Sequence, residues 1–312
     1  MRFFLSLTNS PKQVVELGRF LDDVGSSYFN ICVVFDLADQ TQLSQTQYKH
    51  ALKKLKPKNT LFLSEKIYSK IHPLFVFFGR NFKTIEFVLG NILGYFCREY
   101  FETVSKSRKI VLDDGLIVVS IAKLLVKENR TKEFSFYSSY AHLLDSKVYS
   151  LESHRRCESL DFSDLKTEPG ILGVFGSPLV ESGFMSLGDL EFLVLNAMNF
   201  HNCTSVKYYM HRREILKFNS SIISEICSEN SDSISLVLQS SPIPTKWWSI
   251  YSSALVDLSL FQFPNLGYSF TRVEGISKMN NPYLDSKGIS TLQSIYQVYA
   301  DLKFMEILCP RM

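Results

Sequence analysis

An almost unbroken apolar run, FNICVVF at residues 29–35, is the feature that most constrains the fold. A run of this kind is typical of a strand covered on both faces, as in a parallel sheet flanked by helices. A first strand is expected at 2–7 and a third near 60–63. Between them, a helix opened by Asn9-Ser10-Pro11 and a polar helix at 44–55 supply the crossovers. The order therefore predicts a parallel α/β sheet with right-handed crossovers.

The second half of the chain restarts the same alternation. After a mostly helical region at 71–103 and a strand at 109–112, the pattern fades between 146 and 169 into charged and polar residues, which indicates an interdomain linker. Strands are then expected at 171–175, 205–210, 233–238, 247–251 and 266–270. Helices are expected at 190–198 behind an S-x-x-D capping box that begins at Ser186, at 214–227, from Ser252-Ser253 onward, and at 288–308.

Two α/β halves joined by a polar linker predict two facing Rossmann-like domains, residues 1–165 and 166–312, with a cleft between them. This is the GT-B architecture.

Composition excludes several classes of protein. The formal net charge of +3 over 312 residues is too small for a dedicated nucleic-acid binder. The six cysteines contain no C-x-x-C pair, so no zinc or iron–sulfur spacing exists, and a reducing cytoplasm is the simplest setting. The apolar run at the amino terminus is too short for a signal peptide, and no run approaches the roughly 20 residues that span a bilayer. We therefore expect a cytoplasmic protein.

The segment SVKYYMHRRE at 205–214 carries the first candidate site. It begins as a strand and stops at His211, which is followed by Arg212 and Arg213. An imidazole beside fixed positive charge at the carboxyl end of a strand lies where open α/β sheets bind anionic ligands. The alternative is that His211 is simply a polar surface residue.

Two further segments are expected to converge on the same crevice: VLDDG at 111–115 and WWSIYSSALVDL at 247–258. In the first, Asp113 and Asp114 follow a strand and Gly115 allows a tight turn, although Asp-Gly is also a common solvated turn. In the second, Ser252 and Ser253 are expected at the first turn of a helix. The free N–H groups there would bind an anion; the alternative is that the two serines form an ordinary N-cap. The three segments together suggest a transferase that uses a nucleotide-activated sugar.

Four motifs resemble those of a known family. Three of them resemble, in order, motifs in the carboxy-terminal half of the bacterial lipooligosaccharide sialyltransferases: FGSPLVE, YYMHRRE and IYSSALVDLSLFQFPN. VLDDG resembles the Asp-Asp-Gly motif that they share with other bacterial sialyltransferases and polysialyltransferases. The resemblance covers about half of the chain, from Leu112 to Asn265, and departs in one place: the family's His-Pro is His211-Arg212 here.

The resemblance implies inverting transfer of sialic acid from CMP-sialic acid to a hydroxyl of a glycan or glycolipid acceptor. It implies that His211 is the general acid or hydrogen-bond donor to the departing phosphate, assisted by the donor-binding residues Ser177, Arg212, Arg213, Ser252 and Ser253. The general base is contested between Glu181, which is slightly favoured, and Asp114. Because CMP carries one phosphate and no D-x-D motif appears, we expect no metal and no other cofactor.

Several alternatives stay open. In the first alternative, the fold is the same but the donor is another nonulosonic acid or a nucleotide-linked hexose. In the second, the chain is a catalytically silent relative that binds glycans or a partner enzyme. The lysines at 53, 54, 56 and 58 form a solvated helix end or attract anionic membrane lipid. The oligomeric state stays open, with a homodimer as one alternative.

Overall fold

The structure is a computed structural model, which describes residues 1–37, 40–55, 59–90, 100, 106–113, 115–152, 166–229, 231, 233–240, 242–261, 263, 265–272 and 286–308. It divides into two compact units, one formed by residues 1–40 and 44–158 and the other by residues 41–43 and 159–312. Asp114, Lys56 and Lys58, which were singled out in the sequence, lie outside the described residues.

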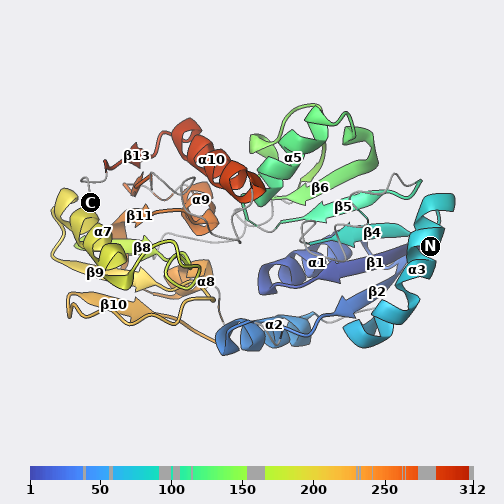
Figure 1. The fold of residues 1–312 in the computed structure, drawn as a ribbon, viewed down its shortest axis with the longest axis horizontal. Coiled ribbons are helices and arrows are strands. Elements are labelled where there is room, and N and C mark those ends of the chain that lie inside the picture. The colour runs from blue at the N-terminus through green and yellow to red at the C-terminus, as the bar shows by residue number, and fades with distance from the viewer. Residues whose placement is uncertain are drawn as a thin grey trace. The chain divides into compact units, whose positions relative to one another are not determined.

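The first unit is built on a seven-stranded parallel sheet with the order β3-β2-β1-β4-β5-β6-β7 (Figure 1). Its strands are β1 (Arg2–Thr8), β2 (Tyr28–Val34), β3 (Thr60–Ser64), β4 (Glu86–Leu89), β5 (Lys109–Leu112), β6 (Phe134–Ser138) and β7 (Tyr149–Glu152). The helices in this part of the chain are α1 (Pro11–Val24), α2 (Gln42–Lys54), α3 (Glu65–Asn81) and α5 (Ile117–Lys127).

Helix α1 shows how local sequence sets an element of this unit. Ser10 caps the helix, since its Oγ accepts a hydrogen bond from the Gln13 N–H at 3.3 Å, and Pro11 occupies the first turn. The apolar stripe that includes Leu17 and Phe20 then packs into the core over β1 and β2. The helix predicted from this capping pattern is confirmed.

The second unit contains a six-stranded parallel sheet with the order β10-β9-β8-β11-β12-β13. Its strands are β8 (Thr167–Phe175), β9 (Ser205–Tyr209), β10 (Ile223–Ile226), β11 (Ile243–Ser249), β12 (Gly267–Phe270) and β13 (Met305–Glu306). Its helices are α7 (Leu187–Phe200), α8 (Ser233–Gln239), α9 (Ser253–Leu260) and α10 (Ser286–Asp301). Counted from its first strand, this sheet repeats the 3-2-1-4-5-6 order that the first unit also contains, which is the Rossmann order. The predicted pair of Rossmann-like α/β units is confirmed.

Two predictions of secondary structure in the second unit are wrong, one of a helix and one of a strand. Residues 214–227 were expected to be helical, but they contain β10; residues 233–238 were expected to form a strand, but they lie in α8. Because β10 and β11 are parallel members of one sheet, the chain between them must cross over, and α8 lies in that crossover. Leu216 and Phe218 are buried ahead of β10, in a segment that is not helical.

Other predictions are wrong in extent. The region 71–103 was expected to be mostly helical, but α3 ends at Asn81 and β4 follows. The predicted polar linker at 146–169 includes β7 and the first residues of β8, and the last helix ends at Asp301, ahead of β13. Among the helices that the structure describes, none is long and apolar enough to cross a membrane.

Candidate functional site

Three neighbouring strands of the second sheet end beside one another, and a motif follows each of them. Strand β8 runs into Gly176-Ser177, β9 runs into the His211 segment, and β11 runs into Ser252-Ser253. Since all three strands are parallel, these segments emerge at the same, carboxyl edge of the sheet. This is the edge at which open α/β sheets bind ligands.

Glu214 joins the first two segments. Its side chain is buried, with 3% exposed. Oε1 accepts hydrogen bonds from the Ser177 N–H at 3.1 Å and the Tyr208 hydroxyl at 2.7 Å, and Oε2 accepts from the His211 N–H at 2.6 Å. Burial raises the pKa of this carboxyl to about 7, although the hydrogen bonds oppose the rise.

Gly176 makes room for that carboxylate. A Cβ at this position would lie 2.2 Å from Glu214 Oε2 and 2.9 Å from a ring carbon of Tyr208, so a side chain larger than hydrogen does not fit. The glycine of the FGSP turn is therefore explained by a partner 38 positions further along the chain. Glu214 was part of the histidine segment in the sequence, but only its spacing of three residues from His211 hinted at a capping role.

Ser177 links the same cluster to the third segment. Its hydroxyl is buried and donates to the Tyr251 carbonyl, which immediately precedes Ser252. The hydroxyl thus already has a partner within the protein, and a direct bond to a ligand would require that contact to open. Contacts of Ser177 and Glu214 bring the segments of Ser177, His211 and Ser252 together. The predicted convergence of the His211 and Ser252 segments is therefore seen within this unit, whereas that of VLDDG, which belongs to the first unit, stays a prediction.

His211 is partly buried, and its ring is oriented by its own loop. Nδ1 accepts a hydrogen bond from the Arg213 N–H at 3.2 Å, so the neutral ring carries its proton on Nε2. Burial, followed by the charges of Arg212 and Arg213, holds the pKa of His211 well below its usual range. At neutral pH the ring is therefore an uncharged donor through Nε2–H, and the two arginines supply the positive charge.

Helix α10 fixes the main chain at the start of the third segment. Ser252 caps α9, since its Oγ accepts from the Ala254 N–H at 3.3 Å. The Tyr299 hydroxyl accepts from the Ser252 N–H and donates to the Ser252 carbonyl, both at 2.7 Å. The helix start predicted at Ser252-Ser253 is confirmed, and Ser253 is its first residue.

Glu181 lies beside the Glu214 cluster. Its side chain is exposed, and Oε1 accepts from the Ile215 N–H at 2.8 Å. Ile215 follows Glu214 directly in the chain, and the negative charge of Glu181 contributes to the raised pKa of Glu214. Glu181 is therefore a surface carboxylate held at the rim of the site.

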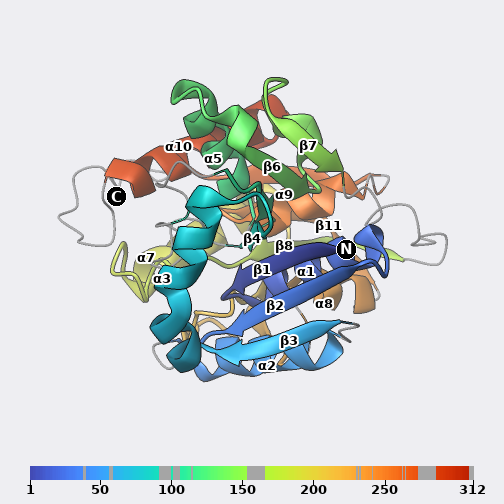
Figure 2. The same ribbon diagram turned by 90° about the vertical axis from the view of Figure 1, so that its right-hand side faces the viewer.

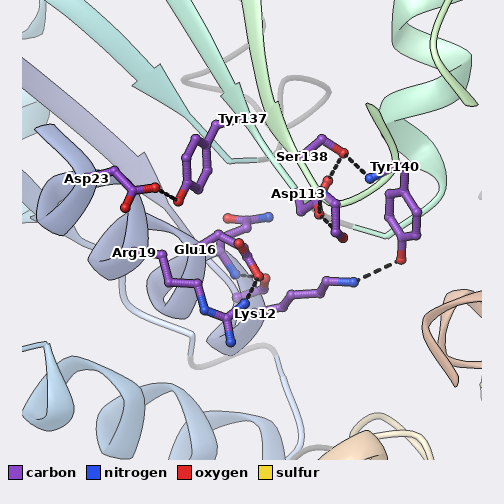
Figure 3. Close-up of polar contacts among 11 residues, drawn as sticks. Lys12, Glu16, Arg19, Asp23, Asp113, Tyr137, Ser138 and Tyr140 are labelled. Carbon is purple, nitrogen blue, oxygen red and sulfur yellow. Dashed lines mark hydrogen bonds and ion pairs between the residues drawn. The ribbon is translucent and has the colours of Figure 1, made fainter. Parts of the chain in front are cut away.

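A second polar cluster lies at the carboxyl ends of β5 and β6 in the first unit (Figure 3). Asp113 is fully buried; one oxygen accepts from the Ser138 hydroxyl, and the other accepts from Ser139 N–H at 2.9 Å and its hydroxyl at 2.7 Å. Burial raises the pKa of Asp113 to about 6, against the opposing charge of Lys12. The predicted turn is confirmed, because Gly115 has a φ of 75°.

Helix α1 contributes to this cluster, a role that was not predicted from the sequence. Lys12 donates to the Tyr140 hydroxyl at 3.1 Å, and Glu16 is buried and paired with Arg19 at 2.7 Å (Figure 3). An acidic residue on the buried face of an amphipathic helix was the only available signal. Asp113 thus anchors the Asp-Asp-Gly segment, while its neighbour Asp114 lies outside the described residues.

In the described part of the chain, no three His, Cys, Asp or Glu side chains are grouped so that they could hold a metal ion.

Comparison with known proteins supports the fold. No protein-family model and no curated protein matches the chain. Among solved structures, Arabidopsis thaliana UGT89C1 complexed with UDP-L-rhamnose is similar with a TM-score of 0.51 and 10% identity, over 98% of this chain and 84% of that one. Methanocaldococcus jannaschii UDP-GlcNAc 2-epimerase, in complex with UDP-GlcNAc and UDP, gives a TM-score of 0.43 and 11% identity, over 96% and 100% of the two chains. The first likeness agrees with the two-unit Rossmann-like α/β fold.

Proposed function

We propose that the protein is an inverting glycosyltransferase that moves sialic acid from CMP-sialic acid to a hydroxyl of a bacterial surface glycan, either lipooligosaccharide or capsule. The observation that carries the proposal is the meeting of the Ser177, His211 and Ser252 segments at one edge of the second sheet. The similar fold of a protein complexed with UDP-L-rhamnose adds support. In this proposal, residues 166–312 bind the donor and residues 1–165 face the acceptor.

The leaving phosphate is assigned to the His211 and Ser252 segments. As the bond between the sugar and the phosphate oxygen breaks, negative charge develops on CMP. The Nε2–H of neutral His211 donates to that oxygen, and Arg212 and Arg213 add positive potential. The first N–H groups of α9, with the hydroxyls of Ser252 and Ser253, are donors suited to the same phosphate.

The acceptor hydroxyl attacks the anomeric carbon from the opposite face, and a carboxylate takes its proton. Glu181 is our first candidate for this base, because it is an exposed carboxylate at the rim of the site. Asp114 is the alternative, and the buried Asp113 would position it.

Glutamine and asparagine variants separate these two candidates. In Glu181→Gln the amide oxygen can still accept from the Ile215 N–H, so the loop stays anchored while the basic group is lost. We expect turnover to fall about 100-fold or more in the variant that removes the base, and far less in the other. Equal, small losses in Glu181→Gln and Asp114→Asn would exclude both.

The proposal as a whole is tested by incubating the protein with CMP-N-acetylneuraminic acid, with and without EDTA, and following the release of CMP. We expect release that EDTA does not affect and that His211→Ala lowers about 100- to 10,000-fold while the fold persists. His201→Ala is the matched control, because this histidine precedes β9, at the other edge of the sheet, and bonds Ser269 at 2.7 Å. No release, even by slow hydrolysis, would overturn the proposal.

Two outcomes favour the alternatives. Release of UDP from a UDP-sugar, with none of CMP, would assign a nucleotide-hexose donor. A catalytically silent, glycan-binding protein is favoured by the arginine that replaces proline after His211, and it predicts that His211→Ala changes no measurable behaviour.

A further inference from the structure

Helix α3 has one apolar face that belongs to the core of the first unit. Tyr68, His72 and Val76 are buried, and the helix packs against β2 and β3. The Tyr68 hydroxyl also lies 2.8 Å from that of Tyr100. Figure 2 shows α3 as a cyan helix beside these strands. This face fixes which side of the helix is turned outward.

The outward side is apolar as well. Ile67, Ile71, Leu74 and Phe78 follow the i, i+4, i+7, i+11 spacing of a single helical stripe. Ile67 is 52%, Leu74 59% and Phe78 42% exposed. A helix with one buried face would ordinarily present polar residues here.

A cluster of phenylalanines extends the stripe at the end of the helix. The rings of Phe77, Phe78 and Phe82 lie 5.8–6.4 Å apart, and each side chain is more than 40% exposed. Exposed aromatic side chains that lie together form an apolar patch, and such patches mark surfaces that contact another protein or a membrane.

Basic residues border this surface. Lys66, Lys70, Arg80 and Lys83 are exposed, whereas Glu65 is the only acidic residue between positions 60 and 83. The Glu65 carboxylate accepts the Asp36 N–H at 2.9 Å, so it is engaged with the adjoining loop. The exposed side of α3 therefore combines an apolar stripe with more basic than acidic side chains.

We propose that this α3 surface, the six apolar residues Ile67, Ile71, Leu74, Phe77, Phe78 and Phe82 with their four basic neighbours, docks the protein on an anionic lipid bilayer. A bilayer offers both an apolar layer for the side chains and a negative headgroup plane for the lysines and arginine. Charge complementarity selects anionic lipid over neutral lipid as the occupant. This surface is distinct from the lysine cluster at 53–58, and the inference does not rest on the proposed enzymatic activity.

Co-sedimentation of the full chain with vesicles tests the inference. We expect binding to vesicles of phosphatidylcholine with phosphatidylglycerol, little binding to phosphatidylcholine alone, and weakening as salt is raised. Phe77→Ser/Phe78→Ser/Phe82→Ser should lower the partition coefficient about tenfold or more. The control Phe192→Ser/Phe200→Ser removes side chains that are 48% and 51% exposed on α7, and it should bind as the unmodified protein does.

A second variant keeps the test decisive if the serine variant folds poorly. Lys66→Glu/Lys70→Glu/Lys83→Glu leaves the apolar stripe intact and should abolish the preference for phosphatidylglycerol. Failure of the unmodified protein to bind these vesicles would overturn the inference. So would equal losses in the α3 and α7 variants, or self-association that the phenylalanine substitutions abolish while vesicle binding is unchanged.

Discussion

Glu214 shows how much a single side chain decides at the residue scale. One buried carboxylate satisfies two backbone N–H groups and a tyrosine hydroxyl, and so fixes where the loops after β8 and β9 leave the sheet. Hydrogen bonds to an ionised acceptor are stronger than those between neutral groups, but burial of the charge opposes them. The raised pKa of about 7 is the net result.

This raised pKa predicts how stability depends on pH. Between the ordinary value of 4.5 and about 7, the folded protein holds a proton that the unfolded chain has released. The free energy of unfolding therefore falls as pH rises through this window, by up to about 1.4 kcal/mol per pH unit from this group. Glu214→Gln should remove that slope, as measured by denaturant unfolding of both proteins at pH 5, 6, 7 and 8.

The slope, rather than the absolute stability, is diagnostic, because glutamine also changes the hydrogen bonds. Glu191→Gln is the comparison, since that less buried carboxylate likewise accepts two backbone N–H groups, from Asn219 and Ser220. A difference between Glu214→Gln and the unmodified protein that stays constant with pH would contradict the prediction.

At the scale of elements, the start of α9 depends on a helix 33 residues further along the chain. Local sequence explains the Ser252 cap. It does not explain why the main chain of Ser252 is fixed, because both of its polar groups bond to one hydroxyl on α10, that of Tyr299. The proposed phosphate site therefore requires that α10 be packed in place.

Tyr299→Phe tests this dependence. The substitution leaves two main-chain groups without their partner, which costs about 1–3 kcal/mol of unfolding free energy. We expect the KM for the CMP-sugar to rise more than kcat falls, since the site is loosened rather than chemically altered. Tyr268→Phe is the control, because that hydroxyl reaches Leu258 at only 3.5 Å. A change in kcat alone would refute the expectation.

At the scale of the molecule, the two units have separate hydrophobic cores. One contains α1 side chains such as Leu17 over β1 and β2, and the other contains α7 side chains such as Leu193 over β8 and β9. Each core is formed by residues of its own unit. The units are therefore expected to lose structure in separable steps.

Alanine substitutions in each core check this expectation. Leu17 and Leu193 are 0% and 1% exposed, so Leu17→Ala and Leu193→Ala should each cost about 2–5 kcal/mol. Differential scanning calorimetry should resolve two transitions, of which each variant shifts a different one. Equal displacement of a single transition by both variants would show that the units unfold as one.

The sequence alone determined those features whose cause is local. The FNICVVF strand, the Ser10 and Ser186 caps, the turn at Gly115 and the start of α9 all depend on residues within a few positions of one another, so pattern and propensity were sufficient. Two Rossmann-like halves followed from the order of such elements. The tertiary structure decided that β10 is a strand and α8 a helix, because the pairing of parallel strands outweighs short apolar spacing. It also decided the partners of Glu214, Ser177 and Tyr299, since a hydrogen bond between groups 37 to 74 positions apart leaves no periodic trace in the chain.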